Sequence, residues 1–420
     1  KPLLMQPPVK NKITMGWDPA FRTGCKICIV DGTGKVLDKT VVYPTPPQNK
    51  TEEAKKTLKA LIEKYGVEVI SCGNGTASKE SEIFIAELIK EIKAETGREV
   101  GYVIVSEAGA SVYSASALGA EEFPDYDVTA RSAVSIARRL QDPLAELIKI
   151  DPKSIGVGQY QHDMNEKRLD SALGGVLEDC VNSVGVDLNT ASVSLLRYVA
   201  GLNSAVAKNI VAYREENGKF TSRKQLLKVP KLGEKAYPQC AGFLRIDCGD
   251  NILDNTAVHP ESYEKAEKLL SLFSYTKEDV RARRISDLRD KLKAYGVDKA
   301  AKETALDKAT LADIVTELMK PGRDIREALP APMLRKDIMG IEDLKPGMEI
   351  TGTVRNVVDF GAFVDIGVHQ DGLVHISEIT DKYIRHPSEV LKVGQVVKVT
   401  VKDVDIKKNR IALTMRKKNK

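Results

Sequence analysis

Hydrophobic and polar positions follow two different patterns over the first 145 residues. Three runs compatible with strands come first, and βα units with apolar residues at helical spacing follow them. The predicted strands lie at about 13–18, 25–31, 35–43, 67–72 and 100–106. The predicted helices lie near 51–65, 79–96 and 128–141. A three-stranded meander followed by βα units predicts a mixed sheet with helices on its faces.

The rest of the chain divides into two helical regions and a strand-rich end. Residues 146–255 are helical with glycine-marked breaks, and residues 256–330 are helical and rich in charge. Pro321-Gly322 and Pro330-Ala-Pro332 then indicate a linker. Five short strands rich in Val, Ile and Thr follow, at about 348–357, 360–366, 371–375, 395–404 and 409–415. Five strands in so short a segment predict a small barrel of the OB type.

These patterns predict a multidomain chain with an α/β part, all-α parts and an all-β part. The predicted domains are 1–145, 146–255, 256–340 and 341–420. A length of 420 residues, with 42% hydrophobic and 29% charged residues, suits a soluble protein of several domains. Each of these domains is large enough to bury a core of its own.

Charge gathers at the C-terminal end. Lysine and arginine outnumber aspartate and glutamate by 64 to 59, and a net charge of +5 is too small to prove a polyanionic partner. Residues 401–420, however, hold eight Lys or Arg against two Asp. We therefore expect that end to attract phosphate or acidic lipid.

The cysteines do not form a disulfide pattern. Six of them are spread over the chain, at positions 25, 28, 72, 180, 240 and 248. The pair in Cys25-Lys-Ile-Cys28 falls inside a predicted strand without a second pair at zinc spacing, which favours two buried thiols over a metal site. We expect a reducing cytoplasm, no cofactor and no metal centre.

Membrane insertion and secretion find no support in the sequence. There is no run of 18 apolar residues and no signal segment at the start. No membrane partner is therefore expected. The first residue is Lys1 rather than Met, so we expect a piece of a longer protein.

The segments TGTVRNVVDFGAFVDIGVHQDGLVHISEI and KVGQVVKVTVKDVDIKKNRIALTMR resemble the RNA-binding domain first named for ribosomal protein S1. This resemblance implies a nucleic-acid face made of Phe360, Phe363, His375 and Arg410, with Lys398 and Lys402 as neighbours. Aromatic faces stack unpaired bases while Lys and Arg follow phosphates, which favours single-stranded RNA.

Two alternatives stay open within this face. Strict strand alternation places residues 360 and 363 on opposite sides, so one phenylalanine belongs to the core unless Gly361 breaks the alternation. His375 taken alone is either a polar core residue or a ligand contact.

The segment LLRYVAGLNSAVAKNIVAYREENGKFTSRKQLLKVPKLGEKAYPQCAGFLRI resembles a tandem helix-hairpin-helix unit. Hairpins of this kind direct free N–H groups of a helix start toward a phosphate. The first hairpin is expected at Ala200-Gly201-Leu202-Asn203, with Ser204 as the helix N-cap and Lys208 as a basic neighbour. The second is expected at Val229-Pro-Lys-Leu-Gly233, followed by Lys235.

The alternative for both hairpins is a compact helix pair that only packs. Glu234 would repel a phosphate beside the second hairpin, and Pro238 limits the helix that follows to a short one.

The N-terminal domain resembles the YqgF branch of the ribonuclease-H-like superfamily. The shared marks are Gly16-Trp-Asp18-Pro, Arg22-Thr-Gly24, Gly73-Asn-Gly75 and Ser106-Glu107. In active relatives three acids hold divalent metal, because two metals must clamp the attacking and leaving oxygens of the phosphodiester. Asp18 and Glu107 supply two of these acids.

The third acid is missing. The last helix reads TARSAVSIARRLQ, with Ser132 and Ser135 where a ligand should project, and the nearest acids are Asp127 and Asp142. A shift of five to ten helical positions moves a ligand by roughly 8–15 Å, which a magnesium site does not tolerate. Asp18 and Glu107 are therefore vestigial, with no catalytic residue expected. Asp18 is expected to accept hydrogen bonds from the Arg22-Thr-Gly24 turn, or else to hold one weak metal or contact nucleic acid.

The order of these modules, with segments such as VSEAGASVYSASALGAEEFPDYDV and EDCVNSVGVDLNTAS, resembles the Tex transcription accessory proteins over nearly the whole chain. The resemblance implies a cytoplasmic factor in transcription that binds RNA, with DNA as an alternative, and that works with RNA polymerase. Its members carry a further N-terminal helical region that we do not find here. We favour a non-catalytic scaffold, and the rival is a metal-dependent endonuclease or junction resolvase using Asp18 and Glu107. The oligomeric state does not follow from the sequence.

Overall fold

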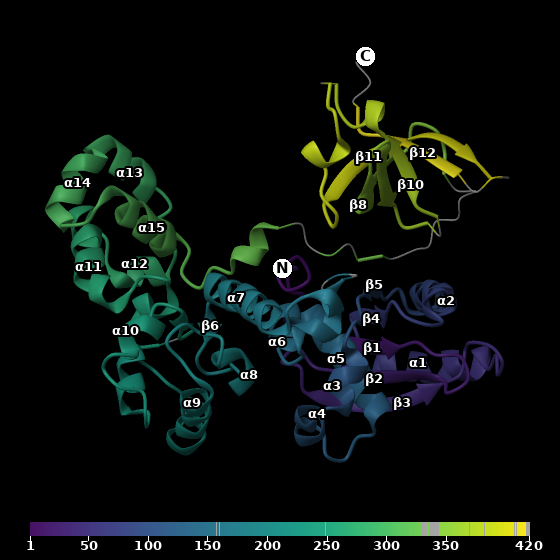
Figure 1. The fold of residues 1–420 in the computed structure, drawn as a ribbon, viewed down its shortest axis with the longest axis horizontal. Coiled ribbons are helices and arrows are strands. Elements are labelled where there is room, and N and C mark those ends of the chain that lie inside the picture. The colour runs from purple at the N-terminus through teal and green to yellow at the C-terminus, as the bar shows by residue number, and fades with distance from the viewer. Residues whose placement is uncertain are drawn as a thin grey trace.

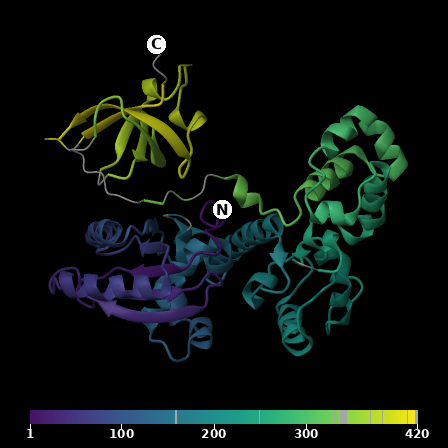
Figure 2. The ribbon, with the colours of Figure 1, turned by 180° about the vertical axis from the view of Figure 1, so that it is seen from behind.

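The computed structural model describes residues 1–416 except 157, 159, 248, 330–331, 333, 336–343, 369, 382, 407 and 409. Cys248, Pro330 and the lysines after residue 416 therefore lie outside the described residues. A sheet domain, a helical part and a barrel are distinct in the ribbon, and the barrel lies over the sheet domain (Figures 1 and 2). The domain boundaries given above stay predictions.

The N-terminal domain is built on a five-stranded mixed sheet. The strands are β1 (Thr14–Asp18), β2 (Cys25–Val30), β3 (Val36–Val42), β4 (Val69–Gly73) and β5 (Gly101–Val105). Their order is β3-β2-β1-β4-β5, with antiparallel pairing along the meander and parallel pairing from β1 to β4 and from β4 to β5. All five predicted strands of this domain are confirmed.

Helices cover both faces of this sheet. The three long helices are α1 (Thr51–Tyr65), α2 (Ser78–Thr96) and α5 (Val128–Gln141). Apolar residues of α1 and α2 share one core with the sheet, and the small Ala133 and Ala137 of α5 pack against Cys28 and Val30 on the other face. These three helices are confirmed. The sequence pattern missed the short helices α3 (Ala110–Ala115), α4 (Ala117–Glu122) and α6 (Pro143–Leu147).

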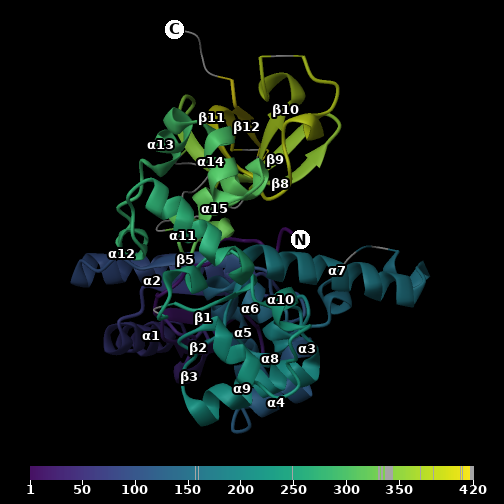
Figure 3. The same cartoon turned by 90° about the vertical axis from the view of Figure 1, so that its left-hand side faces the viewer.

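The helical part contains two separate cores. The first core is formed largely by α7 (Glu166–Val184), α8 (Val193–Leu196), α9 (Ser204–Asn217) and α10 (Tyr237–Cys240). It also holds an unexpected parallel pair of strands, β6 (Val186–Asp187) and β7 (Leu244–Arg245). The second core is formed by α11 (Tyr263–Leu272), α12 (Lys277–Arg281), α13 (Leu288–Tyr295), α14 (Val297–Thr304) and α15 (Lys308–Met319). Figure 3 shows α7 extending sideways from the rest of the molecule.

The C-terminal domain is a closed five-stranded barrel in the order β10-β12-β11-β8-β9. Its strands are β8 (Glu349–Val358), β9 (Gly361–Asp365), β10 (Gly372–His375), β11 (Val396–Asp405) and β12 (Arg410–Thr414). Alternate residues such as Ala362, Val364 and Val374 point into an apolar core. The predicted OB-type barrel is confirmed.

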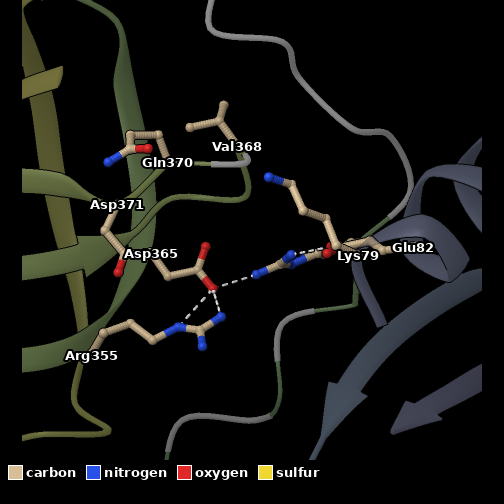
Figure 4. Close-up of a pocket in the computed structure, with 8 residues that line it drawn as sticks. Lys79, Glu82, Arg355, Asp365, Val368, Gln370 and Asp371 are labelled. Atoms are coloured by element: carbon tan, nitrogen blue, oxygen red, sulfur yellow. Dashed lines mark hydrogen bonds and ion pairs between the residues drawn. The ribbon is translucent and has the colours of Figure 1, made fainter. Parts of the chain in front are cut away.

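Arg335 connects the barrel to the sheet domain. Its backbone pairs with Tyr102 at the edge of β5, through two hydrogen bonds of 2.9 Å. Its guanidinium pairs with Glu82 on α2 and, at 2.5 Å, with Asp365 on β9. Figure 4 shows this contact beside a polar cavity of about 330 Å³, into which Lys79 of α2 points.

Five of the six cysteines lie in the described part of the chain. Cys25, Cys28, Cys72, Cys180 and Cys240 are buried free thiols, and the first two lie in β2 as predicted. Burial raises the pKa of Cys28 to about 12, which makes it an unreactive thiol at neutral pH.

None of the helices in the described part of the chain combines the length and apolar character needed to cross a membrane.

Candidate nucleic-acid interface

Two phenylalanine rings lie side by side on the outside of the barrel. Phe363 is on the outer side of β9, between the inward-facing Ala362 and Val364. Phe360 comes just before β9, and its side chain is 52% exposed. The ring centroids are 6.3 Å apart with planes at 87°. Neither ring fills the core, because Phe360 precedes the strand and escapes its alternation.

His375 and Arg410 lie on the same outer surface as Phe363. β9 pairs with β10 so that Phe363 faces Leu373, and Leu373 in turn faces Ala412 of β12. His375 is two residues from Leu373 toward one end of the barrel, and Arg410 is two residues from Ala412 toward the other. At about 3.3 Å per residue, His375 lies about 7 Å along its strand from Leu373, and Arg410 lies about 7 Å along its strand from Ala412. The outer surface thus carries Phe363 on β9, His375 on the neighbouring β10 and Arg410 on β12 beyond it, with His375 and Arg410 displaced toward opposite ends of the barrel.

The imidazole of His375 is held in a fixed orientation. Its Nδ1 lies 2.9 Å from the hydroxyl of Ser377 and accepts a 3.3 Å hydrogen bond from the Ser377 N–H. His375 is exposed and lies opposite Gly361, next to Phe360. The side chain therefore belongs to the surface rather than to the barrel core.

The two lysines predicted as neighbours differ in position. Lys402 forms a 2.6 Å ion pair with Glu378, close to His375 in sequence and space. Lys398 faces Thr351 near the start of β8, whereas the β8 partner of Phe363 is Asn356. Five residues at about 3.3 Å each separate these two points on β8. Lys398 therefore lies apart from the aromatic pair.

The first predicted hairpin precedes α9. Gly201 turns the chain with φ of 79°, in the left-handed region that glycine enters without strain. The N-cap of α9 is Asn203, whose side chain accepts from the N–H groups of Ala205 and Val206, so the prediction of Ser204 as the cap is wrong. The N–H groups of Gly201, Asn203 and Ser204 have no acceptor in the described chain and lie at the exposed end of the helix. Lys208 is exposed one turn further along.

The second hairpin repeats the first with an offset of 30 residues. Leu232 N–H donates to Val229 O, as Leu202 N–H donates to Val199 O. Lys231, with φ of 66°, takes the place of Gly201. Gly233 is thus equivalent to Asn203, not to the turn glycine, and Lys235 is exposed behind it. The helix that follows, α10, is short, as Pro238 predicted.

Lys231 is a candidate contact that the sequence reasoning missed. It is an exposed cation at the tip of the hairpin, in a conformation that costs a non-glycine residue about 1 kcal/mol. Alignment of VAGLN with VPKLG would have located it. The two hairpins also touch, since the Asn209 amide on α9 donates to Pro230 O at 2.7 Å.

Asp18 and Glu107 lie at the same edge of the sheet, at the ends of two parallel strands that have β4 between them, and the charge of Asp18 acts on Glu107. Asp18 ends β1, and Glu107 follows β5 with its carboxylate against the loop after β4. A Cβ on Gly75 would lie 1.6 Å from Glu107 Oε1, so a side chain there would displace the Glu107 carboxylate from this position. Burial raises the pKa of both carboxyls, and the charge of Asp18 raises the pKa of Glu107 further. Oε2 of Glu107 is buried without a hydrogen-bond partner in the described chain.

The position of a third acid is occupied by a hydroxyl. Ser132 of α5 hydrogen-bonds Asp18, in place of the predicted Arg22-Thr-Gly24 turn. Asp127 caps α5, and Asp142 caps α6 and pairs with Arg326 at 2.8 Å. Among the residues placed by the structure, no group of three or more His, Cys, Asp or Glu is arranged to hold a metal.

Comparison with protein families accounts for most of the chain. Residues 12–141 match the "Tex protein YqgF-like domain", and residues 181–245 match the "Helix-hairpin-helix motif". Residues 251–326 match an "HHH domain", and residues 343–416 match the "S1 RNA binding domain". This set of modules defines a multidomain protein of the nucleic-acid-binding class.

Curated relatives identify the family. The chain is 54% identical to "Uncharacterized protein YdcI" of Bacillus subtilis, over 98% of this chain and 56% of the relative. It is 52% identical both to "Protein tex" of Bordetella pertussis and to "Transcriptional accessory protein Tex" of Neisseria gonorrhoeae, over 99% of this chain and 52% and 53% of those relatives. The chain belongs to the Tex family. It spans about half the length of the curated relatives it matches.

Proposed function

We propose that this chain is the nucleic-acid-gripping part of a transcription accessory factor that binds single-stranded RNA and performs no covalent chemistry. The observation that carries the proposal is the pair of adjacent rings formed by the exposed Phe360 and the partly exposed Phe363, on the same outer surface of the barrel as His375 and Arg410. Exposed rings stack bases whatever the sequence, at about 1–3 kcal/mol per base.

The hairpins supply the second half of the proposed grip. The N–H groups of Gly201 and Asn203, and those of Lys231 and Gly233, have no acceptor among the described residues, and we infer that they hold phosphates without reading bases. Lys208 and Lys235 add positive charge beside them. Such contacts fit RNA, with DNA as the alternative.

The partners and location of the whole protein follow from its relatives. Because a relative is named a transcriptional accessory protein, we propose a cytoplasmic role beside RNA polymerase.

A nuclease is the second candidate, and the pairing of Asp18 with Glu107 is the observation that favours it. We propose that the pair is vestigial, because Ser132 stands where the third ligand would be and Asp127 and Asp142 are engaged elsewhere. A two-metal mechanism requires a fuller set of carboxylates than these two. Magnesium-dependent cleavage that is lost in Asp18→Asn would support the nuclease instead.

The test of the proposed grip is removal of both rings. Phe360→Ala with Phe363→Ala should weaken binding of single-stranded RNA more than tenfold, because two stacking contacts are lost. Binding is measured by fluorescence anisotropy in EDTA at several salt concentrations. The matched control is Tyr160→Ala, which removes an aromatic ring that is 69% exposed outside the proposed sites. Full-strength binding by a double variant with a native circular dichroism spectrum would refute the assignment.

A further inference from the structure

The most exposed aromatic side chain of the barrel is not among the residues assigned so far. Tyr383 is 91% exposed, more than any other large hydrophobic side chain in the described part of the chain. It lies between two short 3-10 helices, Ile376–Glu378 and Pro387–Glu389. Exposure of one ring is common in proteins, so its position decides whether it has a role.

The segment that carries Tyr383 leaves the barrel beside His375. Ile376 N–H donates to Phe360 O at 2.9 Å, which places the start of the segment against the aromatic pair. Arg416, which follows β12, then fixes it by donating to Ser377 O at 3.1 Å and to Asp381 at 2.7 Å. Ile376, Ser377 and Asp381 are therefore tied to the barrel.

The segment returns to the same surface after Tyr383. Glu389 accepts from the N–H groups of Arg385 and His386, at 3.1 and 2.9 Å. The Nδ1 atom of His386 lies 4.0 Å from Asp359, the residue before Phe360. Tyr383 is thus presented between two anchors, both of which adjoin Phe360.

We propose that Tyr383 is a third base-stacking platform, which takes the nucleotide next to the one held at Phe360. This inference rests on the proposed function and extends its site to a longer single strand. The neighbouring acids Asp359, Asp381 and Glu389 disfavour a phosphate at this place, whereas stacking on an uncharged base tolerates them. Arg385, which is exposed on the same segment, is the group available to the phosphate that follows.

A tryptophan placed at this position tests the contact directly. The chain has one tryptophan, Trp17, which is fully buried in the sheet domain and gives a constant background. In Tyr383→Trp, emission should be quenched when oligouridylate is added, because the indole stacks on a base. In the control Tyr160→Trp, emission should not change.

Affinity measurements complete the test. Tyr383→Ala should bind long oligouridylate roughly five- to thirtyfold more weakly, and Tyr383→Phe should bind it as the unmodified chain does. On oligomers too short to reach beyond the Phe360 site, all three should bind equally.

Two results separate the inference from the proposed function. Unquenched emission with full affinity of Tyr383→Ala overturns the inference, and the proposed function stands if Phe360→Ala with Phe363→Ala still loses binding. If that double variant also binds normally, both fail. Native circular dichroism of each variant excludes unfolding as the cause.

Discussion

Several side chains at the proposed sites are placed against their own local preference. Phe360 is half exposed although its ring could be buried, and Lys231 adopts a left-handed backbone that glycine would adopt at less cost. Asp18 and Glu107 are held together although each raises the free energy of the other's charged form. Residues that oppose stability in this way are expected at functional positions, which agrees with the sites proposed above.

Asp18 gives a prediction about stability. Because the pKa of Asp18 is raised, its charged carboxylate lowers the free energy of unfolding at neutral pH. Asp18→Asn should therefore stabilise the fold by roughly 0.5–2 kcal/mol. A carboxyl with a raised folded pKa causes a penalty that is complete above that pKa and absent below the unfolded value of 3.8. The gain should therefore shrink as the pH falls toward 4. Urea unfolding at several pH values measures it.

Asp127→Asn is the control for this experiment. The pKa of Asp127 is lowered, chiefly by the N–H of Ala130, so its charge stabilises the fold and its removal should bring no gain. Equal effects of the two substitutions would contradict the environment assigned to Asp18.

The two hairpins share one backbone geometry. Two five-residue loops with the same hydrogen bond and the same left-handed turn stand 30 residues apart and face outward together. Helix α9 depends on the Asn203 cap, which satisfies two N–H groups and leaves those of the hairpin itself free for a ligand.

Loss of this cap should be measurable. Asn203→Ala should lower the free energy of unfolding by about 1 kcal/mol, because two N–H groups lose their acceptor. Ser204→Ala should change it by no more than about 0.5 kcal/mol. Chemical denaturation measures the free energy of unfolding of both variants. A larger decrease in Ser204→Ala than in Asn203→Ala would contradict the assignment of Asn203 as the cap.

Elements with a regular period were predictable from the sequence, and single contacts were not. A strand shows its alternation within about four residues and a long helix repeats its period over several turns, whereas the short helices α3 and α4 span less than two turns and the pair β6–β7 is too short to alternate. Asn203 and Ser204 are both good caps by residue type, so only the backbone distinguishes them. The contact of Arg335 with Tyr102 joins residues far apart in the chain, and no local pattern encodes it.

Arginines hold the modules together at the scale of the whole molecule. Arg223 is 1% exposed and donates to Leu244 O on one side and to Thr256 O and Val258 O on the other, which joins the two helical cores. Arg326 pairs with Asp142 of the sheet domain. Arg335 joins that domain to the barrel. The modules are therefore fixed relative to one another by charge-assisted hydrogen bonds.

The barrel contact can be broken selectively. Arg335→Ala removes the ion-pair partner of Glu82 and one of the two arginines on Asp365, and should weaken docking of the barrel by about 2–5 kcal/mol. Small-angle X-ray scattering should then show a larger radius of gyration. Arg416→Ala, which removes an arginine of the barrel away from this contact, should leave the scattering unchanged. Identical profiles for all three chains would show that Arg335 does not set the arrangement.

One assay addresses binding and cleavage together. Labelled single-stranded RNA is titrated in magnesium with the chain and with the Phe360→Ala, Phe363→Ala variant, and each sample is read by anisotropy and then on a denaturing gel. We predict that the variant binds the RNA more than tenfold more weakly than the unmodified chain does, and that the RNA stays intact in every sample. Equal binding by the folded variant, or RNA cut by the chain but not by Asp18→Asn, would contradict it.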